Sequence, residues 1–305
     1  MTGSALLLLL GIILAVVGGE YFIRGLVGLA AQLRVPPGII AATVAAFATS
    51  APELSVAVNS AAAGRPEIAL GNVLGGNVVN LGLIVGIALL FAPIRVDRAT
   101  LVRNYPAAVA APLVVGLMGL DGTLGLVEGL ILLVIFAAWL AQSAVAAWRV
   151  RTADQETISE RARAPVYFYF LIGLALLIAA GRAIVPGAVG ISSALGWDGF
   201  VVGAVIVALG TSAPELTTVL VARLRGHDEV AVGTILGSNI FNTLLIVGTA
   251  AIIHPITTDS FETDVGILAS ALLVLLIIPA RGRLARWRSL PLLATYAVVV
   301  GLLAG

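Results

Sequence analysis

The chain has 305 residues, of which 60% are hydrophobic and only 11% are charged. A water-soluble domain of this size needs more charged surface, so the composition excludes that class and indicates a polytopic α-helical membrane protein. The formal net charge of +1 indicates no particular partner, and the lack of cysteine excludes disulfide bonds and thiolate chemistry.

Apolar runs of about 20 residues, the length that crosses a bilayer as a helix, recur from one end of the chain to the other. Short stretches rich in proline, glycine and charged residues, such as Pro186-Gly187, separate these runs. The first run lacks the basic segment that begins a signal peptide, so we expect it to be a retained span. The pattern predicts ten transmembrane spans, at approximately 4–24, 36–62, 67–92, 105–120, 124–147, 165–185, 196–222, 230–253, 263–280 and 289–304.

Five of these spans precede a polar stretch and five follow it. Because five is an odd number, the second half must enter the membrane from the opposite side. The predicted fold class is therefore all-α, with two inverted five-helix repeats at 1–148 and 165–305 joined by a short linker at 149–164. All 17 basic residues are arginine, and this topology places all of them except Arg65 and Arg182 on one side. The positive-inside rule then predicts that both chain termini are outside the cell and the linker is cytoplasmic.

The second and seventh spans share a six-residue motif, Thr-Ser-Ala-Pro-Glu-Leu, at 49–54 and 211–216. Its proline cannot donate a backbone hydrogen bond, so we expect the preceding turn to be loosened and its carbonyl groups to be available to a cavity or an ion. Each copy aims a carbonyl, a hydroxyl and a carboxylate at one point, with a second hydroxyl next in the chain. These groups belong to Ala46, Thr49 and Glu53 in the first copy and to Ala208, Thr211 and Glu215 in the second, and the adjacent hydroxyls to Ser50 and Ser212.

The third and eighth spans carry a second doubled motif, Gly-x-x-x-Gly-x-Asn-x-x-Asn, at 71–80 and 233–242. Glycine lets neighbouring helices approach closely, and the asparagines add side-chain oxygens. Burying an ionised carboxylate in a bilayer costs at least a few kcal/mol, so two of them at repeat-related positions indicate function. We expect Glu53 and Glu215 to face each other near the midplane, in a site of hard oxygen ligands that suits calcium, magnesium or sodium.

At these residues the chain resembles the cation/calcium exchanger superfamily, and within it the prokaryotic type of the sodium/calcium exchanger branch. The resemblance covers nearly the whole chain, through Ala-Thr-Ser-Ala-Pro-Glu at 48–53, Gly-Thr-Ser-Ala-Pro-Glu at 210–215 and the two Gly-Asn segments. It implies an antiporter of the plasma membrane that exchanges calcium for sodium by alternating access, without a cofactor, as the first and sixth spans slide against the core. It also implies ion contacts from Glu53, Glu215, Thr49, Ser50, Thr211, Ser212, Ala46, Ala208, Ser238, Asn80 and Asn242.

Two departures from the family pattern concern the ions. Gly76 stands where the second repeat has Ser238, so one flanking sodium site loses a hydroxyl. Asn80 and Asn242 both stand where some relatives carry one aspartate. Two carboxylates remain, enough to neutralise one calcium ion, and the number of sodium ions stays open.

Three other functions are compatible with parts of the pattern. A calcium/proton antiporter would protonate Glu53 and Glu215 in turn, although that branch usually has asparagine where the hydroxyl pairs stand here. A passive cation channel is disfavoured because a tight multi-oxygen site slows conduction. An enzyme is disfavoured most, because no paired nucleophile and base is visible and neither histidine lies in the repeats.

Overall fold

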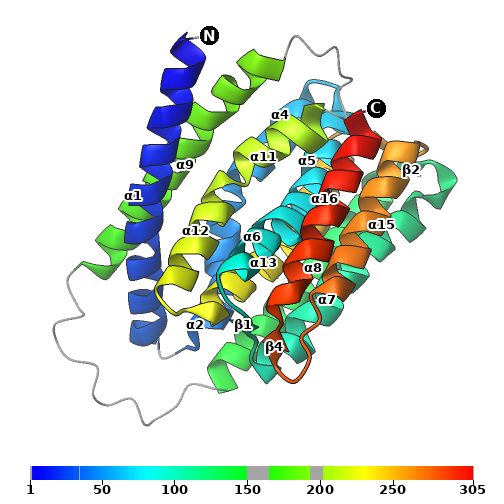
Figure 1. The fold of residues 1–305 in the computed structure, drawn as a ribbon. Helices are drawn as coiled ribbons and strands as arrows, with labels where there is room; N and C mark the ends of the chain where they lie inside the picture. Colours follow the sequence, from blue (N-terminus) through cyan, green and yellow to red (C-terminus); the bar gives the residue numbers. More distant parts are fainter. Residues whose placement is uncertain (1, 34, 150–164, 193–201, 305) are drawn as a thin grey trace.

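The computed structural model describes residues 2–33, 35–149, 165–192 and 202–304. The predicted linker, apart from Arg149, and the first residues of the predicted seventh span lie outside these ranges. The described chain is a bundle of helices with two short β ribbons at its opposite ends (Figure 1). This agrees with the predicted all-α class, since each ribbon strand has only two residues.

Both halves of the chain contain helices that are interrupted by π-helical turns, which are labelled η1, η2, η5 and η6. The segments η3 and η7 are short 3-10 helices. The first half consists of α1 (Thr2–Leu33), α2 (Pro37–Ile40), η1 (Ala41–Ala45), α3 (Ala46–Thr49), α4 (Ala51–Ala62), α5 (Pro66–Val78), η2 (Val79–Ile84), α6 (Val85–Phe91), β1 (Ile94–Arg95), α7 (Arg98–Met118), η3 (Gly119–Asp121), β2 (Thr123–Leu124) and α8 (Leu126–Arg149). The second consists of α9 (Val166–Ser192), η5 (Val202–Val207), α11 (Ala208–Thr211), α12 (Ala213–Leu224), α13 (Asp228–Ile240), η6 (Phe241–Ile246), α14 (Val247–Ile253), β3 (Ile256–Thr257), α15 (Phe261–Leu276), β4 (Arg283–Leu284), η7 (Arg286–Arg288) and α16 (Ser289–Ala304).

Three predicted helix ends were wrong, each for a local reason. Helix α1 does not end at Arg24, because that side chain bonds to Glu20 one turn earlier, at 2.6 Å, and the helix continues. Helix α9 runs through the predicted break at Pro186, since proline costs one hydrogen bond but keeps a helical φ. Helix α7 begins earlier than predicted because Asp97 caps it, accepting from the Thr100 backbone N–H at 2.8 Å.

By length and hydropathy alone, four described helical segments are sufficient to cross a membrane, and one bent pair of helices would make a fifth. The four are Pro66–Phe91, Thr100–Asp121, Leu126–Arg149 and Asp228–Ile253. The predicted second and seventh spans do not qualify as continuous helices because their doubled motif breaks them at Ser50 and Ser212.

The two β ribbons show that the repeats are related by a two-fold axis. In one ribbon Ile94 of β1 lies opposite Leu284 of β4, and in the other Leu124 of β2 lies opposite Ile256 of β3. Strands β1 and β3 occupy equivalent places in the two repeats, as do β2 and β4. The same contact is therefore made twice with the partners exchanged, which is the property of an isologous two-fold interface.

Helices α1 and α9 form an antiparallel pair along one edge of the bundle (Figure 1). Glycines bring the two backbones together: a Cβ on Gly25 would lie 2.2 Å from the Phe170 nitrogen, and one on Gly173 would lie 2.3 Å from the Phe22 nitrogen. The predicted role of glycine in close helix packing is confirmed at these positions. The pair meets α12 through a third glycine, Gly19.

Candidate functional site

The doubled motif gives the same backbone break in both repeats. Helix α3 ends at Thr49, Ser50 leaves the helical region with φ −84° and ψ 7°, and α4 begins at the next residue. In the second repeat Ser212 has φ −80° and ψ 7° between α11 and α12. Proline suits the first turn of the new helix, where its missing donor is not needed. Each glutamate therefore begins a helix directly after a break.

The carbonyl groups of Ala46 and Ala208 are not released as the sequence predicted. The Ala46 carbonyl accepts from the Ser50 backbone N–H at 2.9 Å and from the Thr49 hydroxyl at 3.4 Å. The Ala208 carbonyl is bonded in the same way by Ser212 and Thr211, at 3.0 and 3.3 Å. The widening lies one turn earlier, in the π-helical segments η1 and η5, a geometry that is frequent at functional sites.

The two glutamates meet at the interface between the repeats. The Ser50 hydroxyl donates to Glu215 Oε1 at 3.2 Å, and the Ser212 hydroxyl donates to Glu53 Oε1 at 3.5 Å. Both glutamates are fully buried. The predicted convergence of Glu53 and Glu215 is therefore confirmed, although each serine contacts the glutamate of the other repeat.

The asparagines of the second doubled motif also bond across the interface. Asn80 Nδ2 donates to Asn239 Oδ1 at 3.0 Å, and Asn242 Nδ2 donates to Asn77 Oδ1 at 3.5 Å. These two contacts are again equivalent under exchange of the repeats. They hold Asn80 and Asn242 with their amide nitrogens engaged.

Four oxygens at the centre lack any hydrogen-bond donor among the protein atoms. They are Glu53 Oε2, Glu215 Oε2, Asn80 Oδ1 and Asn242 Oδ1. All four side chains are buried, and they form two repeat-related pairs. Buried acceptors without a donor are costly unless another group satisfies them, and a cation is the group that would satisfy all four together.

The charge of this centre comes from two carboxylates, and its remaining oxygens are neutral. Within the described residues, no group of three or more histidine, cysteine, aspartate or glutamate side chains could hold a metal. Two carboxylates and neutral side-chain oxygens are therefore the groups that the centre offers to a cation.

Comparing the two repeats with each other missed two residues of the site, Asn72 and Thr243, because neither has a counterpart of the same type in the other repeat. Asn72 Oδ1 accepts from the Thr211 hydroxyl at 3.2 Å, and Asn77 Nδ2 donates to the Thr243 hydroxyl at 2.7 Å. The equivalent positions hold Thr234 and Leu81. The available signal was a polar residue inside an otherwise apolar helix.

Ser238 and Gly76, which the sequence paired, differ in what they offer. The Ser238 hydroxyl donates to Glu215 Oε1 at 3.2 Å, and glycine has no side chain to do the same for Glu53. Two hydroxyls donate to Glu215, from Ser50 and Ser238, whereas one donates to Glu53, from Ser212. The site therefore departs from two-fold symmetry beside Gly76, as it does at Asn72 and Thr243.

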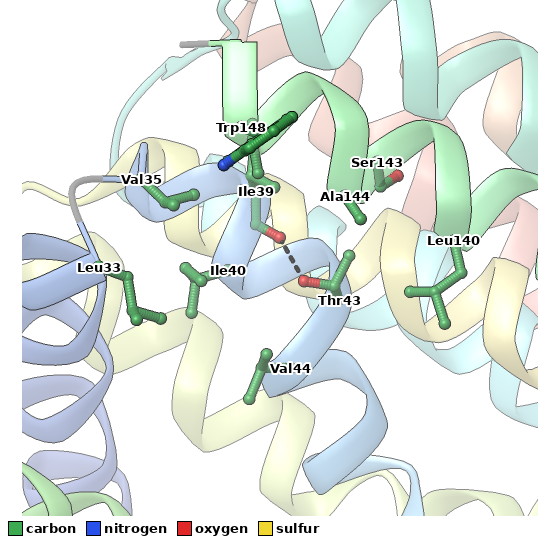
Figure 2. Close-up of a pocket in the computed structure, with 11 residues that line it drawn as sticks. Leu33, Val35, Ile39, Ile40, Thr43, Val44, Leu140, Ser143, Ala144 and Trp148 are labelled. Atoms are coloured by element: carbon green, nitrogen blue, oxygen red, sulfur yellow. Dashed lines mark hydrogen bonds between the residues drawn. The ribbon is translucent and has the colours of Figure 1, made fainter. Parts of the chain in front are cut away.

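A cavity of about 430 Å³ lies apart from these residues, between α8 and the segment that includes α2 and η1 (Figure 2). Its lining is almost entirely apolar, with Leu33, Leu140 and Trp148 among the residues labelled in Figure 2. Its hydroxyls are those of Thr43, which donates to the Ile39 carbonyl at 2.8 Å, and Ser143. With no carboxylate in its lining, this cavity does not have the composition of a cation site.

Comparisons with known proteins match nearly the whole chain. The family model described as sodium/calcium exchanger protein matches residues 3–145 and 165–305. The inner membrane protein YrbG of Escherichia coli (strain K12) is 31% identical over 88% of this chain and 87% of its own. The sodium/calcium exchanger MaX1 of Methanosarcina acetivorans is 25% identical over 97% of both. A structure of the sodium-calcium exchanger NCX_Mj soaked with Na⁺ and Sr²⁺ superposes with a TM-score of 0.85 at 26% identity, covering 98% of each chain.

Proposed function

The chain belongs to the family of sodium/calcium exchanger proteins, and on this premise we propose that it is a secondary antiporter exchanging calcium for sodium by alternating access. As a member of this family it is a multi-pass membrane transporter and not an enzyme. The transported ions would be its ligands, and no cofactor is part of the proposal.

The four buried acceptor oxygens between the repeats carry this proposal. Glu53 and Glu215 supply two negative charges, which balance one Ca²⁺, and Asn80 and Asn242 supply neutral oxygens of the kind that calcium takes. An ion at this point would lie on the two-fold axis and contact both repeats equally. Inverted repeats with a central site between broken helices are the common construction of alternating-access transporters.

Sodium would use the hydroxyls and carbonyls that surround the carboxylates. The proposed ligands, besides the two glutamates, are Thr49, Ser50, Thr211, Ser212, Ser238 and the carbonyls of Ala46 and Ala208. Each of these carbonyls accepts one backbone hydrogen bond and a longer one from the hydroxyl of Thr49 or Thr211, and a sodium ion would take the place of that hydroxyl hydrogen. Sodium and calcium would then compete for the same two carboxylates, which is the requirement for exchange.

The α1–α9 pair would provide the movement. These helices pack on each other through glycine, and α1 meets α12 through Gly19 and through an ion pair between Glu20 and Arg225. That ion pair is partly exposed, and such pairs are weak. The α1–α9 pair could therefore slide as one unit past the glutamates. The two chain ends lie at the end of the bundle opposite the β1–β4 ribbon with Arg95 and Arg283 (Figure 1), which supports termini outside the cell.

Calcium flux into proteoliposomes tests the coupling ion. We expect an outward-directed sodium gradient to drive uptake of radioactive calcium into vesicles loaded with sodium, at equal pH on both sides. A pH gradient without sodium should drive none. Equal uptake under a pH gradient alone would instead support calcium/proton exchange, and calcium flux without any counter-ion would support a channel.

A further inference from the structure

The β1–β4 ribbon, at one end of the bundle (Figure 1), carries two arginines directly opposite each other. Arg95 of β1 pairs with Arg283 of β4, so both side chains lie on the same face of the ribbon, and both are exposed. Like charges in directly opposite positions destabilise the pairing of two strands. Neither of these ribbon arginines forms an ion pair or a side-chain hydrogen bond with any residue that the structure describes. Their mutual repulsion is therefore not offset by a paired acid.

The fold itself does not require arginine at these positions. In the two-fold related β2–β3 ribbon the exposed pair is Thr123 and Thr257, which pack across the strands without charge. The turn that leads into β4 is unusual in the same way, because Arg281 has a φ of 53°, in the left-handed region that favours glycine and asparagine. The ribbon therefore keeps basic residues at a cost to its own stability, and such costs are frequent at functional sites.

A hollow of about 730 Å³ lies beside the ribbon, and both ribbon arginines line it. Its other walls include Ala92, Gly282 and the turn between α12 and α13. Arg223 of α12 is fixed in this wall, since its guanidinium group pairs with Asp228 and donates to the Ala92 carbonyl at 2.7 Å. The hollow has the volume of a site for a small ligand.

Three acidic residues also line the hollow, and each already has a partner in the protein. The Asp97 carboxylate caps α7, and Asp228 pairs with Arg223. The Glu229 carboxylate lies 3.5 Å from a ring nitrogen of His227. Of the charged side chains that line the hollow, only the ribbon arginines are without a partner among the described residues. The hollow therefore favours an anion.

We propose that this hollow binds a phosphate group, held between Arg95 and Arg283. Guanidinium groups present planar sets of donors that match the oxygens of phosphate in pairs. A bound phosphate turns the repulsion across the ribbon into a bridge, and this bridge joins the two repeats because each strand belongs to a different one. The site does not depend on which ions are transported.

Two sources of phosphate reach this end of the bundle. The topology proposed above places the ribbon at the cytoplasmic leaflet, where anionic lipids are found and where soluble phosphate is also available. The chemistry that recognises the phosphate group is the same for both, so the experiment has one arm for each source.

Thermal unfolding of the purified full-length protein tests the site. In the first arm, Tris phosphate is compared with Tris chloride at equal ionic strength in a neutral detergent, because these salts add no sodium. In the second, nanodiscs of phosphatidylcholine are compared with nanodiscs that also contain phosphatidylglycerol. We expect a rise in Tm of about 5 °C at saturation in at least one arm. A rise in the first arm identifies soluble phosphate as a ligand, and a rise in the second alone identifies a lipid headgroup. No rise in either arm would overturn the proposal.

Arg95→Gln and Arg283→Gln distinguish a binding site from a structural role. Each variant removes the repulsion across the ribbon, so we expect a Tm without phosphate that equals or exceeds that of the parent. Each also loses charge-assisted hydrogen bonds to the ligand, so binding should weaken at least about tenfold and the rise in Tm should disappear.

Arg281→Gln is the matched control. It removes the same charge from the turn of the same ribbon, but Arg281 does not line the hollow, so the rise in Tm should remain. An equal loss in all three variants would mean a non-specific attraction to a basic surface and would overturn the site. A rise that survives in both Arg95→Gln and Arg283→Gln would overturn it as well.

Discussion

Replacing Glu53 or Glu215 by glutamine is expected to abolish calcium exchange while leaving the folded protein intact. The amide has nearly the shape of the carboxylate, but it leaves only one negative charge to balance a buried Ca²⁺. Removing one partner of a buried, paired charge costs about 3–5 kcal/mol, equivalent to a loss of roughly 100- to 1,000-fold or more in binding. Both variants should fail because the two glutamates occupy equivalent places in the repeats.

Sodium-driven uptake of radioactive calcium measures this effect, and size-exclusion chromatography of the detergent-solubilised variants checks that they fold. Glu67→Gln is a matched control. Glu67 also lies in the first turn of a helix, α5, but its side chain is 47% exposed and pairs with Arg65 at 3.5 Å. Calcium transport at the parental rate by Glu53→Gln or Glu215→Gln would refute the proposed site.

The core of the site could be predicted from sequence because the motif occurs twice. The second copy is independent evidence that its residues have a function. A single membrane-embedded glutamate could be a neutral packing residue, whereas Glu53 and Glu215 recur in identical surroundings. The two-fold relation then requires equivalent groups to meet, and the Ser50 and Ser212 bonds show that they do. Knowing that two groups meet did not require knowing the helix ends.

Because the prediction relied on the two repeats being alike, it missed residues that occur in only one of them. Asn72 and Thr243 complete the network around Thr211 and Asn77, but their counterparts are Thr234 and Leu81, so a comparison of repeats passed over them. The local partners of the backbone were also out of reach. Whether the Ala46 carbonyl is free or bonded depends on a rotation at one residue, Ser50, which composition and periodicity do not encode.

The helix ends that were predicted wrongly share a different cause. The predicted ends were placed by assuming about 20 residues for each membrane crossing, which means that a helix ends where the bilayer does. Helix α1 has 32 residues and continues well past Arg24, and α9 has 27 and includes Pro186. These two helices pack along each other at the edge of the bundle, through Gly18, Gly25, Gly28 and Gly173, and both are longer than the thickness of a bilayer requires.

Alanine at Gly75 or Gly237 is expected to destabilise the protein and to stop transport, although neither residue touches the proposed ion. A Cβ at Gly75 would lie 2.1 Å from the Ala204 carbonyl oxygen, and one at Gly237 would lie 2.2 Å from that of Ala42. Both obstacles are backbone atoms of the π-helical segments η5 and η1, so no side-chain rotation relieves them. Overpacking of this kind typically costs about 1–3 kcal/mol.

The loss of transport should exceed what that destabilisation alone would cause. To accommodate the methyl group, α5 must move away from η5, or α13 from η1, by roughly 1 Å, and binding sites tolerate errors of only about 0.5 Å. Helices α5 and α13 hold Asn77 and Asn239, whereas η1 and η5 lead into the turns that hold Ala46 and Ala208. The shift therefore moves Asn77 and Asn239, which accept from the proposed ligands Asn242 and Asn80, relative to the turns that hold Ala46 and Ala208.

Thermal unfolding followed by size-exclusion chromatography, with calcium uptake on the fraction that remains folded, measures both effects. Gly76→Ala is the control, because its Cβ has room and the substitution is one residue from Gly75 in the same helix. A general intolerance of α5 to alanine would affect Gly75 and Gly76 alike. Contact with η5 would affect Gly75 alone, and the equal response of Gly237 would follow from the two-fold axis that places both glutamates at its centre.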